Sequence, residues 1–387
     1  MQNKGTSKND LQRLCAVLAK DDEQPWIRKL NAHARQASAE RAWQAVASFY
    51  RRCKDGDSKK GFPKFKKHSR SVEYKTSGWK LSEDATTITF TDGFQAGTFE
   101  LWLNGEARQL IQSLKLNRVR VVKRADGYYA QFCIDAERTD TVEHTGSVVG
   151  IDLGLQYFTK DSQGKEVVCP KFLRQSEKRL KRAQRKLAKK FKKGVKGQSK
   201  NYHKQRQQVG KIHLKVQRQR KDFAIKQARC VVRSHDMVAY EDLQVSNMVK
   251  NHHLAKSIMD AGWYQYTQWL GYYGKLWDKI VVAVPPQYTS QDCSSCGYRV
   301  KKTLSTRTHR CPKCGLQLCR DQNAAINILK RGLAIVGAEY NNSTEGHSES
   351  AEPSGKTEEI SIAAAGESSS TVNAVCEPVT ARESPRL

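Results

Sequence analysis

Four cysteines in the last third of the chain have the spacing of metal ligands. They form two CxxC pairs that are separated by fourteen residues: Cys293 and Cys296, then Cys311 and Cys314. Gly297 and Gly315 follow the pairs and relieve the tight turn behind each of them. Two such knuckles make a tetrahedral four-thiolate site, so we expect a structural Zn²⁺. A pair of disulfides is the alternative, but the spacing fits zinc and no apolar secretory leader opens the sequence.

Three acidic residues come at points where carboxylates are poorly suited to packing. Asp152 follows the apolar run Ser147–Ile151, Glu241 follows Met237–Tyr240, and Asp321 opens the segment after the second knuckle. A buried carboxylate is costly unless it is paired or binds a cation. Acids that converge at one end of a sheet repel one another, and divalent cations relieve that repulsion. Two Mg²⁺ ions held there would activate water against a phosphodiester.

Each acid also has a plainer interpretation when taken alone. An Asp at the start of a helix, as at Asp321, is more often an N-cap than a catalyst. Many strands that precede a glycine turn carry a structural Asp, as at Asp152. The catalytic interpretation therefore depends on all three acids meeting.

The elements that must position these acids alternate between strands and helices. Short apolar runs and turn signals predict five strands, at Ser147–Ile151, Gln156–Thr159, Glu166–Val168, Met237–Tyr240 and Lys279–Val284. An aromatic-rich segment between the last two strands is expected to be a core helix, and a small-residue helix begins at Asp321. Three separated acids can then converge at one end of a mixed sheet.

The charge of the chain points to a polyanionic partner. The 387 residues include 68 Lys and Arg against 39 Asp and Glu, a formal net charge of +29. Such an excess repels itself unless a polyanion neutralises it, so we expect nucleic acid. A membrane surface is disfavoured because no apolar run of about 18 residues is present. The seven other cysteines are scattered, as free thiols of a reducing cytoplasm would be.

The most basic stretch lies between the third and fourth strands. Residues 171–220 hold 20 Lys and Arg and one acid, Glu177. A sparse apolar stripe predicts two long helices that are broken near Gly194–Gly197. We favour an insertion that grips a nucleic-acid duplex, because like charges one turn apart destabilise a helix unless phosphates neutralise them. A solvated or coiled-coil arm is the alternative.

The amino-terminal third differs from the rest in pattern. Residues 8–54 show helical periodicity, and residues 72–136 show short alternating strands with a hairpin turn at Ala125–Gly127. We expect two helices followed by a small β-barrel. Beyond residue 338 the chain is rich in Ser, Glu and Ala, which predicts a disordered tail.

Five segments resemble motifs of the TnpB (OrfB) family, which insertion sequences encode and which is related to type V CRISPR effector nucleases. They read GIDLGLQYFT, YEDL, YTSQDCSSCG, CPKCG and RDQNAAINIL. The resemblance covers about residues 10–335. It implies that Asp152, Glu241 and Asp321 form a catalytic triad that binds Mg²⁺. It also implies that the four knuckle cysteines bind Zn²⁺.

The resemblance implies an α+β multidomain chain whose centre is an RNase H-like (RuvC) mixed α/β nuclease core with an inserted zinc ribbon. The implied parts are a recognition-like helical segment (1–60), a wedge-like β-barrel (61–140), the core (141–290) with a basic helical insertion (171–235), the ribbon (291–318), a last core helix (319–337) and the tail (338–387). The implied activity is RNA-guided, Mg²⁺-dependent cleavage of DNA. A transposon-end RNA would act as guide, and a short adjacent DNA motif would be read by the amino-terminal domains.

Two departures from the family pattern lead to expectations of their own. The family usually begins with a strand and a helix before the region that matches Thr6–Pro25, so we expect a misassigned start or a truncated copy. The family also tends to carry an Asp two residues before the last catalytic acid, where this chain has Cys319. We expect a modest effect, although a fifth thiol could compete for zinc.

Two other functions remain open from the sequence. A transposase that transfers DNA strands would use the same triad, because cutting and joining both act on phosphodiesters. A nuclease-dead zinc-ribbon protein that only binds nucleic acid is the second. A defined co-purifying RNA would favour the guided nuclease over both.

Overall fold

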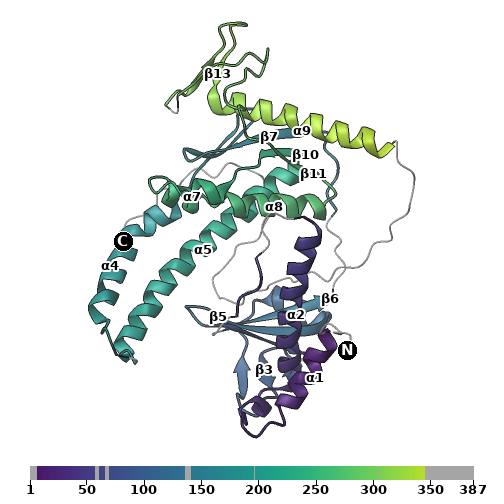
Figure 1. Ribbon diagram of the computed structural model, residues 1–387, viewed down its shortest axis with the longest axis vertical. Helices are drawn as coiled ribbons and strands as arrows, with labels where there is room; N and C mark the ends of the chain where they lie inside the picture. Colours follow the sequence, from purple (N-terminus) through teal and green to yellow (C-terminus); the bar gives the residue numbers. More distant parts are fainter. Residues whose placement is uncertain are drawn as a thin grey trace, which may run out of the picture. The chain divides into compact units, whose positions relative to one another are not determined.

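The computed structural model describes residues 7–56, 61–65, 69–135, 141–195, 197–303 and 305–344. These residues fall into two compact units that divide at residue 138. No helix within these ranges is both long enough and apolar enough to cross a bilayer. The predicted mixed α/β class is confirmed, with several separate sheets (Figure 1).

The first unit begins with the two predicted helices, α1 (Lys8–Leu18) and α2 (Ala32–Lys54). Ser7 and Asp10 form a capping box that fixes the start of α1. The side of α2 that is buried carries Ala34 and Ala37. Near the other end of the helix, Tyr50 lies at the surface and is 64% exposed.

The strands of the first unit form two three-stranded sheets and not one closed barrel among the described residues. The sheet orders are β1-β5-β6 and β2-β3-β4. Their bounds are β1 (Ser71–Lys75), β2 (Trp79–Leu81), β3 (Thr87–Phe90), β4 (Thr98–Glu100), β5 (Lys115–Lys123) and β6 (Tyr128–Asp135). The hairpin expected at Ala125–Gly127 joins β5 to β6. Helix α3 (Gly105–Ser113), which was not predicted from the sequence, precedes β5.

One hydrophobic core serves both small sheets. Trp79 and Ile88 come from one sheet, Val119 and Phe132 come from the other, and Ala34 of α2 packs against them. The difference from a barrel is therefore one of pairing, because the strands share a core without closing into a single ladder.

The second unit is built on a five-stranded mixed sheet of order β11-β10-β7-β8-β9. The strands are β7 (Val148–Leu153), β8 (Tyr157–Asp161), β9 (Glu166–Val168), β10 (Met237–Glu241) and β11 (Ile280–Val284). The first three form an antiparallel meander, and β10 runs parallel to both β7 and β11. All five predicted strands are present, each within three residues of its expected bounds.

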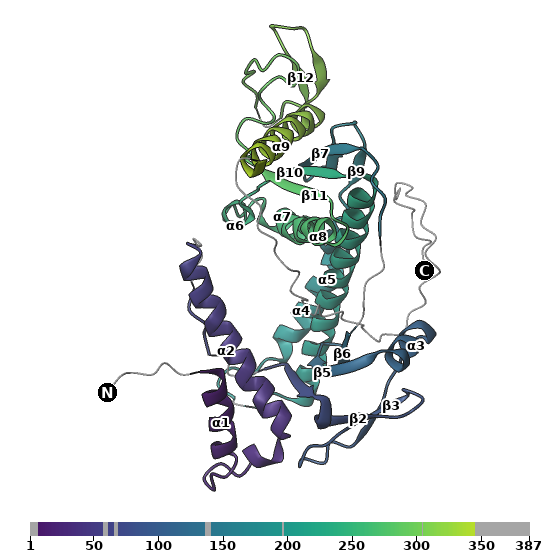
Figure 2. The ribbon, with the colours of Figure 1, turned by 90° about the vertical axis from the view of Figure 1, so that its right-hand side faces the viewer.

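Helices cover both faces of this sheet (Figures 1 and 2). Val149 and Ile151 face α5 (Lys200–Ser234) and α8 (Trp263–Leu276), which carry most of the core. The long helix α9 (Arg320–Thr344) packs on the other face. Two short helices, α6 (Val245–Met248) and α7 (Ala255–Ala261), follow β10.

Two glycines let α9 lie directly on the sheet. A Cβ added to Gly150 of β7 would lie 2.1 Å from the carbonyl oxygen of Ala325. A Cβ added to Gly332 of α9 would lie 2.6 Å from the Ala239 Cβ of β10. Both distances are far inside van der Waals contact, so only glycine allows this approach.

The basic insertion is a helical hairpin, as predicted. It consists of α4 (Phe172–Lys190) and α5, and the break lies at residues 191–199. Buried Asp260 of α7 accepts hydrogen bonds from the Leu173 amide and the Arg220 guanidinium, which ties both helices to the core. The last helix extends past its predicted end, since α9 includes residues 338–344 of the expected tail. The remaining tail, 345–387, lies outside the described residues.

Candidate active site and metal centre

Two neighbouring parallel strands bring Asp152 and Glu241 to the same level. In the register between β7 and β10, Ile151 pairs with Tyr240, so the next residue of each strand is the predicted acid. Parallel strands place their carboxyl ends at one edge of the sheet. The two carboxylates are therefore neighbours at that edge.

The third acid approaches from α9 on the same face. Successive side chains of a strand alternate between faces, so Asp152 faces the same side as Gly150, and Glu241 the same side as Ala239. Both of these residues contact α9. On the helix, Asp321 lies one turn before Ala325, the residue that rests on Gly150. The structure thus gathers all three predicted acids on the α9 side of the sheet.

The three acids lie close enough for their charges to act on one another. Burial raises the pKa of Asp152 well above its ordinary value, and the charges of Glu241 and Asp321 raise it further. Burial also raises the pKa of Glu241, with the Asp321 charge adding to it. The hydrogen bond from the Thr289 hydroxyl and the charge of the Arg331 guanidinium act in the opposite direction and lower the pKa of Glu241. Neighbouring carboxylates repel one another when all of them are ionised, and a bound divalent cation relieves that repulsion.

The donor set fits hard divalent cations, which prefer carboxylate oxygens. The three acids are nevertheless spread more widely than the cysteines. Within the described residues, the four knuckle cysteines are the group of three or more candidate ligands whose donor atoms all lie within 4.8 Å of one another. The three carboxylates therefore interact through their charges, and their oxygen atoms are less tightly grouped than the four cysteine sulfur atoms.

These acids have basic and hydroxyl neighbours that were not predicted from the sequence. The Arg320 Nε donates to the Asp321 carboxylate over 2.9 Å, and Thr289 donates to the buried Glu241 carboxylate. Arg331 donates to the carbonyl oxygens of Pro285 and Gln287 in the loop after β11. Their only signal in the sequence is adjacency to a motif, since Thr289 precedes the first CxxC pair and Arg320 precedes Asp321.

The four cysteines lie together in two nearly identical knuckles. The Sγ atoms of Cys293 and Cys314 are 3.6 Å apart, and those of Cys296 and Cys311 are 3.5 Å apart. Gly297 (φ +73°) and Gly315 (φ +75°) donate to the carbonyl oxygens of the first cysteine of each pair. The four thiols suit a tetrahedral metal such as Zn²⁺.

Within the cluster, Cys311 gives up its proton before Cys296, because burial and the neighbouring thiols raise the pKa of Cys296 to about 11. Burial alone would raise the pKa of Cys311, but hydrogen bonds from the backbone amides of Cys314 and Lys313 oppose it and bring that pKa to about 6. Thiolates are the form that binds metals. Cys319 does not belong to the cluster, and its thiol contacts the Lys160 ammonium, which is also paired with Glu166.

Two asparagines of α9 fasten the first knuckle to the helix that carries Asp321. The Asn323 side chain donates to the Asp292 carbonyl and accepts from the Ser294 amide, so it brackets Cys293. One turn later, Asn327 donates to the carbonyl oxygens of Thr289 and Asp292. The metal centre and the carboxylate site are therefore built on one helix.

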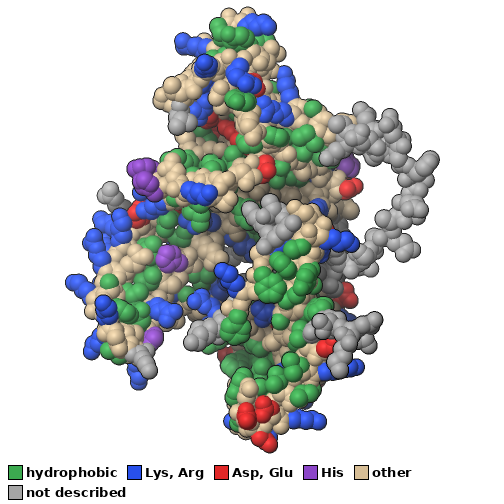
Figure 3. Space-filling view, in the orientation of Figure 1, with side chains coloured by type: hydrophobic (Ala, Val, Ile, Leu, Met, Phe, Trp, Pro, Cys, Tyr) green, Lys and Arg blue, Asp and Glu red, His purple; other side chains and the backbone are tan. Residues whose placement is uncertain are grey.

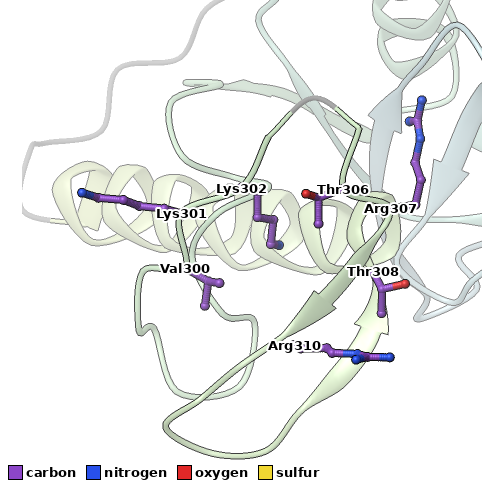
Figure 4. Close-up of a pocket in the computed structure, with 7 residues that line it drawn as sticks. All are labelled: Val300, Lys301, Lys302, Thr306, Arg307, Thr308 and Arg310. Carbon is purple, nitrogen blue, oxygen red and sulfur yellow. The ribbon is translucent and has the colours of Figure 1, made fainter.

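Basic side chains gather on two surfaces of this unit. They follow the α4–α5 hairpin, over which blue side chains gather in Figure 3. Arg182, Arg185 and Lys189 are exposed on one side of α4. Basic side chains also line a pocket of about 420 Å³, formed by the segment that joins the two knuckles in the sequence and drawn in Figure 4. Its lining residues are Val300, Lys301, Lys302, Thr306, Arg307, Thr308 and Arg310. Arg320, at the start of α9, donates to carbonyl oxygens of this segment.

Comparison with known proteins finds two family profiles that divide these features between them. Residues 131–252, which include Asp152 and Glu241, match the OrfB_IS605 profile, described as a probable transposase. Residues 263–328, which include the four cysteines and Asp321, match the Cas12f1-like TNB domain. The resemblance to the TnpB/OrfB family is confirmed.

Two curated proteins match most of the length of this chain. A putative RNA-guided DNA endonuclease of Escherichia coli (strain K12), InsQ, is 29% identical over 332 residues, which cover 81% of this chain and 78% of that protein. A putative RNA-guided DNA endonuclease of Streptomyces pristinaespiralis is 28% identical over 321 residues, with coverages of 81% and 75%.

A solved structure shares the fold. The chain in a cryo-EM structure of a Cas12f1–sgRNA–target DNA complex superposes with a TM-score of 0.50, over 84% of this chain and 76% of that one. Sequence identity is 14%, so the likeness concerns the fold alone.

Proposed function

We propose that this protein is an RNA-guided, Mg²⁺-dependent DNA endonuclease of an insertion sequence. The observation that carries the proposal is the convergence of Asp152, Glu241 and Asp321 at the carboxyl ends of β7 and β10. A strand order of β11-β10-β7-β8-β9, with an antiparallel meander followed by two parallel strands, supports an RNase H-like (RuvC) core. Relatives named as RNA-guided DNA endonucleases support the same assignment.

The three acids would hold the catalytic metal, two Mg²⁺ ions by the two-metal scheme. When bound, such ions activate a water and stabilise the leaving oxygen of a phosphodiester. Arg320 holds the Asp321 carboxylate in place. The hydrophobic core beneath Asp152 excludes water from the other face of the sheet. The four cysteines would hold a structural Zn²⁺ that shapes the ribbon.

The basic surfaces supply the contacts that the substrate needs. The α4–α5 hairpin would hold the phosphates of a guide–target duplex, because its exposed Arg and Lys side chains follow one side of a helix. The basic pocket of the ribbon would take a phosphate of the strand that enters the carboxylate site, since Arg320 connects the two. DNA and a guide RNA from the transposon end are the proposed partners, and the reducing cytoplasm is the proposed location.

We also propose the domain assignment that the resemblance implies. Residues 1–60 would be the recognition-like segment and 61–140 the wedge-like part that reads the DNA motif. Residues 141–290 would be the nuclease core with its insertion at 171–235, 291–318 the ribbon and 319–337 the last core helix. Limited proteolysis tests the outer boundaries, because exposed linkers are cut first.

Cleavage with a matched guide tests the function. The protein is purified with the RNA from its own transposon end, and a DNA duplex matched to the guide is offered with and without Mg²⁺. We expect Mg²⁺-dependent cleavage that Asp152→Ala abolishes. Joined strands in place of cut ends would favour the strand-transfer transposase. Binding without any cleavage, by the unaltered chain, would favour a nuclease-dead binding protein.

A further inference from the structure

Thr289 connects the two candidate metal sites. It is 3% exposed, and its hydroxyl donates to the Oε1 of Glu241, which is itself buried. The same hydroxyl lies 3.1 Å from the carbonyl oxygen of Pro286. A hydroxyl has one proton to donate, and an ionised carboxylate can only accept. The proton therefore goes to Glu241 when that carboxylate is charged.

Helix α9 holds Thr289 through the same asparagine that holds the backbone just before the first knuckle. The Thr289 carbonyl oxygen accepts from the Asn327 side chain over 2.8 Å, and the same amide donates to the Asp292 carbonyl over 2.7 Å. Asn323 then holds the backbone on both sides of Cys293, at 2.8 Å and 2.9 Å. Asn323 and Asn327 are themselves buried, so water competes little with these bonds. Thr289 and Cys293 are therefore fastened to the same two side chains of α9, so the two positions are connected.

We propose that Thr289 is a positioning residue that couples the four-cysteine site to the carboxylate site. Its hydroxyl holds the Glu241 carboxylate in the orientation that binds a divalent cation, and a filled cysteine site holds Thr289. The inference rests on the proposed function, because it assumes that the three acids bind a cation. Groups that orient a metal ligand in this way affect metal affinity by about 10- to 100-fold when removed.

The test measures cation binding directly, so it does not depend on cleavage. Mn²⁺ is the probe, and its free concentration is followed by electron paramagnetic resonance with the full chain loaded with Zn²⁺. Thr289→Val removes the hydroxyl at nearly constant volume, and Thr289→Ser keeps it. Thr159→Val is the matched control, since Thr159 is also buried in this unit and pairs across the ladder with Leu153 and not with an acid. Asp152→Ala marks the loss of the site.

We expect Thr289→Val to bind Mn²⁺ about 10-fold more weakly than the unaltered chain, with the same zinc content. Thr289→Ser and Thr159→Val should bind as the unaltered chain does. Stripping Zn²⁺ should weaken Mn²⁺ binding in the unaltered chain but add little in Thr289→Val. Such non-additivity is what two changes to one connected path produce.

Three results would overturn the inference, and they separate it from the proposed function. Wild-type Mn²⁺ affinity in Thr289→Val would remove the positioning role and leave the nuclease proposal intact. Equal weakening in Thr289→Val and Thr289→Ser, together with a lower melting temperature in both, would show a packing role only. If the unaltered chain binds no Mn²⁺, or Asp152→Ala binds it equally well, the carboxylate site fails and the inference fails with it.

Discussion

Gly150 of β7 lies directly beneath Ala325 of α9, so close that a Cβ on Gly150 would lie 2.1 Å from the Ala325 carbonyl oxygen. This contact sets the height of α9 above the sheet. It also sets the position of Asp321, one turn earlier on the helix, over Asp152, two residues later on the strand. One glycine thus determines how two candidate catalytic acids meet.

Gly150→Ala should therefore impair the site although no acid is changed. The added methyl group must push the backbone of α9 away, an overpacking cost of about 1–3 kcal/mol or more. We expect a lower melting temperature. We also expect Mn²⁺ affinity and the cleavage rate to fall by a larger fraction than the free energy of unfolding does. Calorimetry and the Mn²⁺ titration measure the two effects on the same sample.

Gly337→Ala is the control for this variant. Gly337 lies in the same helix, and nothing lies within 4 Å of an added Cβ. Alanine there should stabilise the helix by up to about 1 kcal/mol. A Gly150→Ala protein with normal stability and normal metal binding would show that the close contact does not set the site.

Asp152→Asn should stabilise the protein while it abolishes cleavage. The pKa of the Asp152 carboxyl is raised in the folded state, so the folded protein holds that proton more tightly than the unfolded chain does. The metal-free protein therefore loses stability as pH rises through the raised pKa, and the amide removes this loss. We expect the melting temperature at neutral pH to rise by a few degrees.

The pH dependence of the difference between the two proteins checks the sign. Asp236 has a lowered pKa and Glu177 has one near 2, so both carboxylates lose their stabilising interactions in acid. They do so equally in both proteins and cancel in the difference. The advantage of Asp152→Asn should shrink as pH falls and Asp152 takes up its proton. An advantage that grows toward acid pH would contradict the raised pKa.

The sequence predicted the elements of the second unit well because strong local signals define them. Apolar runs of about five residues define β7 and β10, and each ends at an acid. The knuckle spacing defines the four-cysteine cluster. The break at Gly194–Gly197 separates α4 from α5 as expected. Strand, turn and helix signals here agree with the tertiary contacts.

What the sequence could not predict depends on pairing and on side-chain partners. The strands of the first unit alternate as barrel strands do, but their pairing divides them into two sheets with one core. Helix α3 spans only nine residues between strand patterns, so the spacing of Ala107, Leu110 and Ile111 covers barely two turns. The contact of Thr289 with Glu241 joins residues 48 positions apart, and nothing in either segment names the other. Domain boundaries and the catalytic role of the triad stay predictions.

Removal of one knuckle thiol should release the structural metal. We expect one Zn²⁺ per chain in the purified protein and none bound stably in Cys296→Ser, because a tetrahedral site needs all four thiolates. Cys319→Ser should keep its zinc, since that thiol lies outside the cluster. Metal analysis after gel filtration measures both. Zinc that is retained in Cys296→Ser and lost once Cys319→Ser is added would support the competing fifth thiol expected from the sequence.

The basic hairpin should contribute nonspecific affinity that salt weakens. Arg182, Arg185 and Lys189 are exposed on one side of α4, so all three side chains are accessible to a phosphate backbone. Changing all three to Gln should reduce the slope of log affinity against log salt by about one for each lost phosphate contact.

Lys226→Gln is the control, because Asp222 already neutralises that ammonium at 2.9 Å. Fluorescence anisotropy with a labelled RNA–DNA duplex at several salt concentrations gives the slopes. Equal slopes for the triple variant and the unaltered chain would show that the hairpin is a solvated arm and that the duplex binds elsewhere.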